Sequence, residues 1–280
     1  MALLNSTDML KKANKNGYAV GNFDVFNIEM INGVLSSAEK TESPVILAFA
    51  EPFEEFIPLE QFATVAKDAA TRSSVPVALH LDHANNLPFI QRAIACGFTS
   101  VMIDASDKSL KENIRITSEI SALCRPKDIS VEAELGHVGG LEGTVQSDDL
   151  SYDTNVEEAR EFVSATAVDS LAVSIGTVHG VYQTKPALNL ARLDELKKAL
   201  WIPLVLHGGS GLSNDELRDC IKLGINKVNI FTDLALAAME SAGSDAKNNT
   251  PYIECCCHIT TAVAEVAEKR MAVIGSVGNA

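Results

Sequence analysis

The sequence has little positive charge and no apolar run long enough to span a membrane. Its 280 residues contain 23 Lys and Arg against 37 Asp and Glu, which gives a formal net charge of −14. Binding to a nucleic-acid backbone requires a continuous face of Lys and Arg, so we expect no nucleic-acid partner. The lack of a spanning-length apolar run predicts no membrane partner either.

The sequence also lacks a regular cysteine pattern and an export signal. Its six cysteines stand at irregular spacing, and three of them are adjacent at positions 255–257. In a chain of this length, such cysteines are typical of reduced thiols rather than of a disulfide framework. Residues 1–12 lack a basic start followed by a long apolar stretch. Together these absences predict a cytoplasmic location.

Eight short runs rich in Val, Ile, Leu and Ala recur along the chain and predict eight β-strands. Nearly continuous apolar runs are expected for parallel strands that are buried on both faces. The runs are residues 19–25, 44–50, 76–82, 100–104, 130–136, 170–176, 203–209 and 227–233. Segments with helical spacing lie between them, including residues 87–96, 111–123, 157–165, 190–200 and 214–223.

This alternation of strand and helix predicts an α/β fold of the (β/α)8 TIM-barrel type, with a doubly wound open sheet as the alternative. Barrels of this kind commonly form one domain at a length near 280 residues. Neither a linker rich in Pro, Gly or Ser nor an internal repeat divides the chain, so we expect one domain over residues 1–280. Residues 252–273 predict one or two extra C-terminal helices, which serve packing or subunit contact.

Three of the six histidines stand where an apolar run gives way to a loop: His83, His179 and His207. Three neutral imidazoles that converge from different strands, with a fourth position left for water or substrate, form the ligand set of a catalytic zinc ion. In a barrel, the catalytic groups lie at the C-terminal ends of the strands. One such histidine alone is more often a hydrogen-bonded core residue, but three at separate strand ends favour a metal site.

Carboxylates stand at the same strand ends. Alternation along a strand aims Asp82 differently from His83, so Asp82 either exchanges a proton with substrate or orients an imidazole. Glu132 and Glu134 are two residues apart and should face the same way. We expect one of them at the site and the other beside a buried cation or amide. The remaining polar residues of this set are Asp104, Asn229, Thr232 and Asp233.

Two glycine-containing segments have the features of ligand-binding loops. Gly208, Gly209 and Ser210 stand at the end of the seventh run, and residues 229–232 lie near the end of the eighth. Barrels often build a phosphate site from the loops after their last two strands, where backbone N–H groups approach an oxyanion closely. Residues 136–149 form a second segment with four glycines, too long for a plain turn, which predicts a lid.

In combination, these residues resemble the class II, zinc-dependent ketose-bisphosphate aldolases, and most closely the tagatose-bisphosphate aldolase branch. The matching stretches cover nearly the whole barrel: residues 79–83, 97–104, 131–136, 169–180, 203–211 and 227–233. The resemblance implies reversible cleavage of a ketose 1-phosphate or 1,6-bisphosphate of the fructose or tagatose type. The implied products are dihydroxyacetone phosphate and an aldehyde, formed through a metal-stabilised enediolate.

The resemblance also implies roles for individual residues. His83, His179 and His207 would bind one catalytic Zn2+ ion. Asp82 would donate a proton to the aldehyde oxygen in the condensation direction. Glu142, within the predicted lid, would move the proton at the carbon of the dihydroxyacetone phosphate unit.

Further positions match binding residues of the family. Asp104 and Glu134 match a second or alternative metal site that some members have. The residues that match the dihydroxyacetone phosphate pocket are Gly180, Gly208, Gly209, Ser210, Asn229, Ile230, Phe231 and Thr232. Gly180 and Ser210 also lie near a monovalent cation in relatives. The resemblance further implies a small phosphorylated sugar as substrate and a homodimer or homotetramer as assembly.

Three positions depart from the family pattern and leave alternatives open. Asp24 stands where relatives usually carry Asn, Ala50 where a serine helps to hold phosphate, and Gln183 where a lysine is usual. These departures favour a ketose 1-phosphate that is not a bisphosphate as the alternative substrate. A metal-dependent barrel hydrolase or epimerase, or a sugar-phosphate binding protein without catalysis, is the alternative from another class. A binding protein would have no use for the acid–base pair of Asp82 and Glu142.

Overall fold

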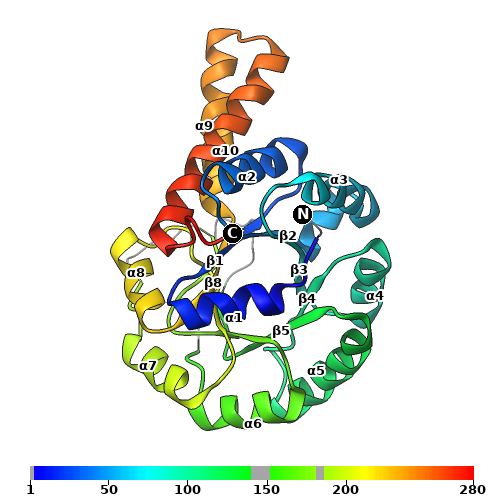
Figure 1. Cartoon of the computed structure of the whole chain (residues 1–280), viewed down its shortest axis with the longest axis vertical. Helices are drawn as coiled ribbons and strands as arrows, with labels where there is room; N and C mark the ends of the chain where they lie inside the picture. Colours follow the sequence, from blue (N-terminus) through cyan, green and yellow to red (C-terminus); the bar gives the residue numbers. More distant parts are fainter. Residues whose placement is uncertain (1–2, 140–151, 181–185) are drawn as a thin grey trace.

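The predicted strands form a closed barrel in which every neighbouring pair is parallel, including β8 with β1 (Figure 1). The structure is a computed structural model that describes residues 3–139, 152–180 and 186–280. The strands are β1 Val20–Asp24, β2 Val45–Ala50, β3 Val77–Ala84, β4 Ser100–Ile103, β5 Ser130–Leu135, β6 Ser170–Val173, β7 Leu204–Leu206 and β8 Ile225–Ile230. Their closed order confirms the TIM barrel and excludes the open sheet.

Helices surround the barrel (Figure 1), and several of them begin at a side-chain cap that the sequence supplies. For example, the Asn155 side chain accepts hydrogen bonds from the first N–H groups of α6, and Ser213 forms a capping box with Glu216 at the start of α8. The helices are α1 Ser6–Asn16, α2 Ile28–Lys40, α3 Leu59–Arg72, α4 Leu87–Cys96, α5 Leu110–Cys124, α6 Val156–Thr166, α7 Leu190–Ala199, α8 Asn214–Lys222, α9 Thr232–Asn248 and α10 Tyr252–Ile274, with short 3-10 helices at Glu51–Glu55 and Arg125–Lys127.

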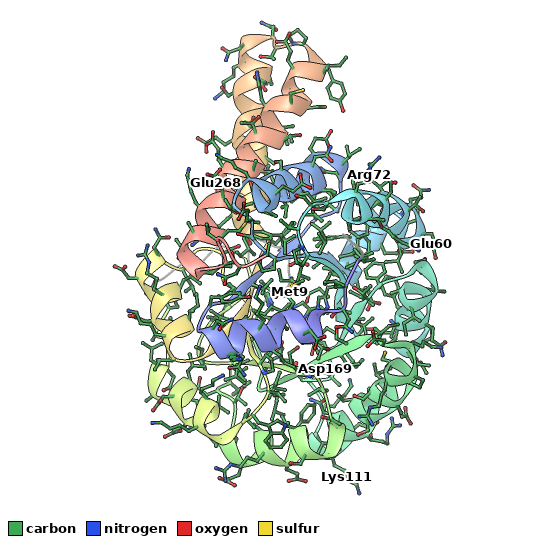
Figure 2. All side chains as sticks on the ribbon, viewed as in Figure 1. Met9, Glu60, Arg72, Lys111, Asp169 and Glu268 are labelled. Carbon is green, nitrogen blue, oxygen red and sulfur yellow. The ribbon has the colours of Figure 1, made fainter. Side chains whose placement is uncertain are left out.

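Helix α1 crosses the N-terminal end of the barrel, opposite the strand ends that carry the predicted site (Figure 1). Met9 of this helix packs with Val20 and Ile46 in a small apolar cluster, separate from the main core. In Figure 2 the same view shows Met9 together with Asp169, which directly precedes β6. Residues of α1 and Asp169 line one cavity at this end, so α1 caps the barrel from below.

Helices α9 and α10 pack against each other and extend beyond the ring of helices (Figure 1). The extra C-terminal segment predicted for residues 252–273 is the single helix α10, which also packs against α2. Its adjacent cysteines at 255–257 belong to none of the candidate metal clusters of the described residues. Within those residues, no helix has the length and apolar character needed to cross a membrane.

Several strand ends differ from the prediction, and two of these differences concern the candidate site. Strand β8 ends at Ile230, so Thr232 and Asp233 open helix α9 instead of closing the strand. Strand β7 ends at Leu206, and Gly208 follows with a left-handed backbone, φ 66°. A Cβ atom at Gly208 would lie 2.3 Å from the carbonyl oxygen of Val178, so the loops after β6 and β7 approach too closely for any side chain there.

Candidate active site and metal centre

The three histidines predicted as metal ligands converge at the C-terminal mouth of the barrel. His83 Nε2 lies 2.8 Å from His207 Nδ1 and 3.1 Å from His179 Nε2. In a tetrahedral zinc site with Zn–N distances of about 2.0 Å, the ligand nitrogens lie about 3.3 Å apart. The donor set and its spacing therefore fit a zinc ion.

Carboxylates on the far side of two rings fix which nitrogen faces the centre. Asp104 Oδ2 lies 2.9 Å from His83 Nδ1, and Glu132 Oε1 lies 3.0 Å from His207 Nε2. Each ring donates its N–H to the carboxylate and leaves the lone pair of its other nitrogen on the centre. Carboxylate partners of this kind orient ligand histidines around zinc and increase their basicity.

Burial keeps two of the rings neutral, which is the form that binds a metal. It lowers the pKa of His179 and of His207, and the positive charge that His83 carries when protonated acts in the same direction. Burial would also lower the pKa of His83, but Asp82 and Asp104 outweigh it and raise this pKa. Metal binding at His83 would therefore release a proton.

A local backbone irregularity brings His83 to the mouth. Regular alternation would point its side chain outward with Leu79 and Leu81, which pack in the core between the barrel and the helices. However, His83 has a left-handed backbone, φ 47°, and the register with β4 shifts between Leu81 and Ala84. The expectation that Asp82 and His83 aim differently is therefore corrected, because Asp82 Oδ2 lies 3.8 Å from His83 Nε2.

Asp104 and Glu134 form a second cluster that shares His83. One ligand atom from each of the three residues lies within 4.8 Å of the others. Burial and the nearby negative charge of Asp104 raise the pKa of Glu134 to about 8. A cation beside Glu134 would remove this electrostatic cost, so the cluster is suited to an alternative metal position.

Asp82 is fully buried beside the histidines and has defined partners on β3 and β8. Asn229 Nδ2 on β8 donates to both of its oxygens, at 3.2 and 3.0 Å. His80 Nε2 lies 3.4 Å from Asp82 Oδ1. The carboxylate is thus held at the mouth, adjacent to the point where the histidine nitrogens meet.

A buried ion pair between Lys227 and Glu132 lies in the barrel interior, below the histidines. Lys227 Nζ lies 2.9 Å from Glu132 Oε1 and 3.4 Å from His80 Nε2, and all three side chains are almost fully buried. Burial would raise the pKa of Glu132, but Lys227 and the hydrogen bond from His207 outweigh it and lower this pKa to about 2. His80, Asp82 and Glu132 have metal-ligating geometry, yet the Lys227 ammonium already supplies the cation there.

Replacing Lys227 by methionine should strongly destabilise the fold, because it leaves the Glu132 carboxylate buried without its cation. We expect the free energy of unfolding to fall by about 3–5 kcal/mol. Urea denaturation followed by circular dichroism measures this change. The double variant Lys227→Met/Glu132→Gln should recover part of the loss, and an unchanged midpoint in Lys227→Met would contradict the role of the pair.

The predicted phosphate loops meet at the start of helix α9. Ser210 Oγ accepts hydrogen bonds from the backbone N–H groups of Phe231 and Asp233, at 3.2 and 3.3 Å. Gly209 N–H donates to the carbonyl oxygen of Asn229 at 3.1 Å. These bonds bring Gly208, Gly209 and Ser210 together with the segment from Asn229 through Ile230 and Phe231 to Thr232, and they place a helix N-terminus at the barrel mouth.

Some predicted residues lie outside the described ranges. These are Glu142 and the rest of the lid from Gly140 onward, together with Gln183. The lid's first residues are described, and Gly139 accepts a hydrogen bond from His179 N–H at 2.8 Å. Gly180, the next residue after His179, is buried at the same mouth.

Two site residues, His80 and Lys227, were missed by the sequence analysis. Signals for both were present: His80 stands two residues before Asp82, and Lys227 stands two residues before Asn229 in a run that predicts a buried strand. Alternation puts each pair on one strand face, and a charged residue in a buried strand requires a partner. The partner itself could not be identified, because Lys227 and Glu132 are 95 residues apart.

Comparison with known proteins places this geometry in a family. The family model of the class II fructose-bisphosphate aldolases matches residues 4–279. The uncharacterized protein YdjI of Escherichia coli (strain K12) is 40% identical over 265 residues, 94% of each chain. The crystal structure of the YdjI aldolase from Escherichia coli K12 superposes with a TM-score of 0.90 at 36% identity, covering 99% of both chains. A putative fructose-1,6-biphosphate aldolase from Coccidioides immitis gives a TM-score of 0.91 at 32% identity, covering 97% of this chain and 96% of the other.

Proposed function

The chain belongs to the class II fructose-bisphosphate aldolase family and is a lyase of the aldolase type, and we propose that it cleaves a ketose 1-phosphate to dihydroxyacetone phosphate and an aldehyde in a zinc-dependent reaction. The convergence of three imidazole nitrogens on one point, beside a buried carboxylate, carries this proposal. When bound, a zinc ion would act as a Lewis acid toward the negative charge that develops on the ketose oxygens during carbon–carbon cleavage.

The loops after β7 and β8 would hold the phosphate of the dihydroxyacetone phosphate unit. Support comes from the bonds that join Ser210 to the start of α9, because they hold the N-terminus of this helix beside the loop after β7, on one side of the mouth. Gly208 and Gly209 allow the backbone to approach an oxyanion without a side chain between them. Ser210 keeps its hydroxyl proton for the ligand, because its oxygen accepts both backbone bonds.

Two carboxylates would divide the proton transfers. Asp82 would remove the proton from the substrate hydroxyl during cleavage and return it to the aldehyde oxygen during condensation. Glu142 would transfer the proton at the carbon of dihydroxyacetone phosphate. It stands three residues after Gly139, which is bonded to His179, and three residues of extended chain span about 10 Å. This length of chain would allow Glu142 to reach the centre.

The mouth favours a ketose that carries phosphate at one end only. The carboxylates of Asp24 and Glu51 stand at the ends of β1 and β2, and Ala50 lacks the hydroxyl that helps relatives hold phosphate. Negative charge there would repel a second phosphate. We therefore propose a ketose 1-phosphate with an uncharged distal end as the better substrate and the hexose 1,6-bisphosphates as the weaker ones.

Proton exchange at dihydroxyacetone phosphate tests the enzymatic proposal. Zinc-loaded protein should exchange a C3 proton of dihydroxyacetone phosphate with solvent deuterium, which proton NMR follows directly. EDTA should stop the exchange, and added zinc should restore it, because the Lewis acid stabilises the carbanion that exchange requires. Absence of exchange in zinc-replete protein would rule out the aldolase reaction.

Release of dihydroxyacetone phosphate tests the substrate proposal. A coupled assay across a panel of ketose 1-phosphates and ketose 1,6-bisphosphates of equal chain length should give the higher kcat/KM for the monophosphates. The matched variant Ala50→Ser restores the family's usual hydroxyl and should raise kcat/KM for bisphosphates selectively. Higher kcat/KM for a bisphosphate in the unmodified protein would overturn this preference.

A further inference from the structure

A continuous line of polar side chains in close contact crosses the barrel from Asp82 to its opposite end. His80 Nε2 contacts Asp82, and His80 Nδ1 lies 2.7 Å from Ser100 Oγ. Ser100 Oγ lies 3.1 Å from Ser6 Oγ on α1, and Ser6 Oγ lies 2.7 Å from Ser130 Oγ on β5. Each member is buried, and a serine hydroxyl can both accept and donate a hydrogen bond.

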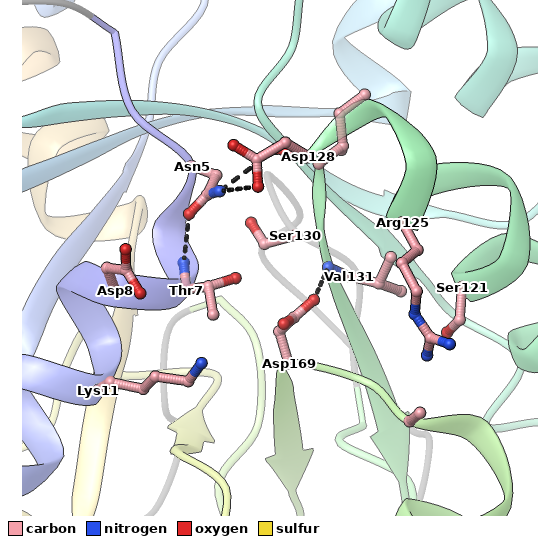
Figure 3. Close-up of a pocket in the computed structure, with 12 residues that line it drawn as sticks. Asn5, Thr7, Asp8, Lys11, Ser121, Arg125, Asp128, Ser130, Val131 and Asp169 are labelled. Carbon is pink, nitrogen blue, oxygen red and sulfur yellow. Dashed lines mark hydrogen bonds between the residues drawn. The ribbon is translucent and has the colours of Figure 1, made fainter.

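The line ends at a polar cavity of about 260 Å³ on the N-terminal side of the barrel (Figure 3). Ser130 lines this cavity, together with charged side chains from α1 and from the loops before β5 and β6, including Asp8, Asp128 and Asp169. A polar cavity of this size holds several water molecules. Asp82 is fully buried at the other end, so the line connects a buried carboxylate with water.

The groups around His80 keep its imidazole ring neutral and determine which ring nitrogen carries the proton. Burial lowers the pKa of His80, and the adjacent Lys227 ammonium lowers it further. Lys227 donates to His80 Nε2, so this nitrogen keeps its lone pair and Nδ1 carries the proton that is donated to Ser100. A neutral imidazole can accept a proton at one nitrogen while it releases one from the other.

We infer that His80, Ser100, Ser6 and Ser130 form a proton relay between Asp82 and the water of the N-terminal cavity. The inference rests on the proposed function, in which Asp82 exchanges a proton with substrate. It gives Asp82 a route to solvent at the end of the barrel opposite the proposed substrate site. His80 and the three serines are positioning residues in this relay, since they act through Asp82 and do not touch substrate.

For each proton that enters the relay from Asp82, one proton leaves it at Ser130. After cleavage, protonated Asp82 passes its proton to His80 Nε2, while the Nδ1 proton of His80 moves to Ser100. Each hydroxyl then passes its own proton onward, from Ser100 to Ser6 and from Ser6 to Ser130, which releases one to water. His80 ends as the other neutral tautomer with the hydroxyls reversed, and this arrangement carries a proton back to Asp82 in the condensation direction.

A matched pair of variants at Ser6 separates a relay from a purely structural network. Threonine and valine have the same shape, so Ser6→Thr and Ser6→Val impose the same steric change, but only threonine keeps the hydroxyl. We expect Ser6→Val to lower kcat for dihydroxyacetone phosphate release about tenfold, a modest part of the range for assisted proton transfer, and Ser6→Thr to restore most of it. Exchange of the C3 proton, which does not use Asp82, should be equal in the two variants.

The outcomes distinguish failure of the relay from failure of the proposed function. Equal cleavage rates in Ser6→Thr and Ser6→Val, with C3 exchange intact, would overturn the relay and leave the aldolase proposal standing. Absence of C3 exchange in the zinc-loaded unmodified protein would remove the aldolase proposal itself. If both Ser6 variants fail to fold, Ser130→Ala is measured against Ser37→Ala, a buried serine of α2 that bonds Ala264 outside the line. Only Ser130→Ala should slow cleavage, and equal rates would overturn the relay.

Discussion

Replacing His207 by alanine is expected to remove the metal and nearly all activity. His207 is fully buried and contributes one of the three converging nitrogens, and alanine has no donor atom to replace it. Lewis-acid stabilisation is worth several kcal/mol, and we expect kcat/KM for dihydroxyacetone phosphate release to fall about 10⁴-fold. Elemental analysis of the purified variant should show less than stoichiometric zinc.

His258→Ala is the matched control for this variant. His258 lies on α10, half-exposed, where it bonds Asp245 and contacts none of the three histidines. The control should keep both zinc and activity, because only histidines of the mouth belong to the proposed centre. Full zinc content with unimpaired cleavage in His207→Ala would contradict the assignment of the three-histidine centre.

The barrel could be predicted because its strands are encoded locally. Near-continuous apolar runs such as residues 44–50 leave little choice but a strand buried on both faces, and eight of them alternate with helical spacing. The strand ends were harder, because backbone contacts between loops decide them. Strand β7 stops at Leu206 where Gly208 passes the carbonyl of Val178, a contact that becomes visible only in three dimensions.

The sequence predicted which residues gather at the candidate site, but it did not predict how they contact one another. The three histidines and Asp82 stand at recognisable strand ends, whereas the left-handed backbone that turns His83 inward follows no residue pattern. Polar links such as Lys227 with Glu132 join strands that are distant in sequence, so periodicity alone cannot pair them. Periodicity likewise does not predict the contacts among the serines between His80 and the N-terminal cavity, because each of these serines is a common small residue in its own segment.

Replacing Asp82 by alanine should separate the two proton transfers of the proposed reaction. Asp82 would serve the substrate hydroxyl and the aldehyde oxygen, so its loss should lower cleavage and condensation about 10²- to 10⁴-fold. The histidines and the loops after β7 and β8 remain, and Glu142 would still exchange the C3 proton of dihydroxyacetone phosphate. Proton NMR in deuterium oxide and the coupled release assay measure the two processes on the same zinc-loaded sample.

Asp82→Asn sharpens this test, because asparagine keeps the side-chain volume but cannot act as the acid or base. It should reproduce the alanine result, with cleavage lost and exchange retained, if proton transfer is the function of the carboxylate. Since Asp82 also accepts two hydrogen bonds from Asn229, a purely structural role predicts that both variants lose exchange along with cleavage. Equal loss of both processes would therefore overturn the division of roles between Asp82 and Glu142, whereas exchange without cleavage would place Asp82 on the aldehyde side of the reaction.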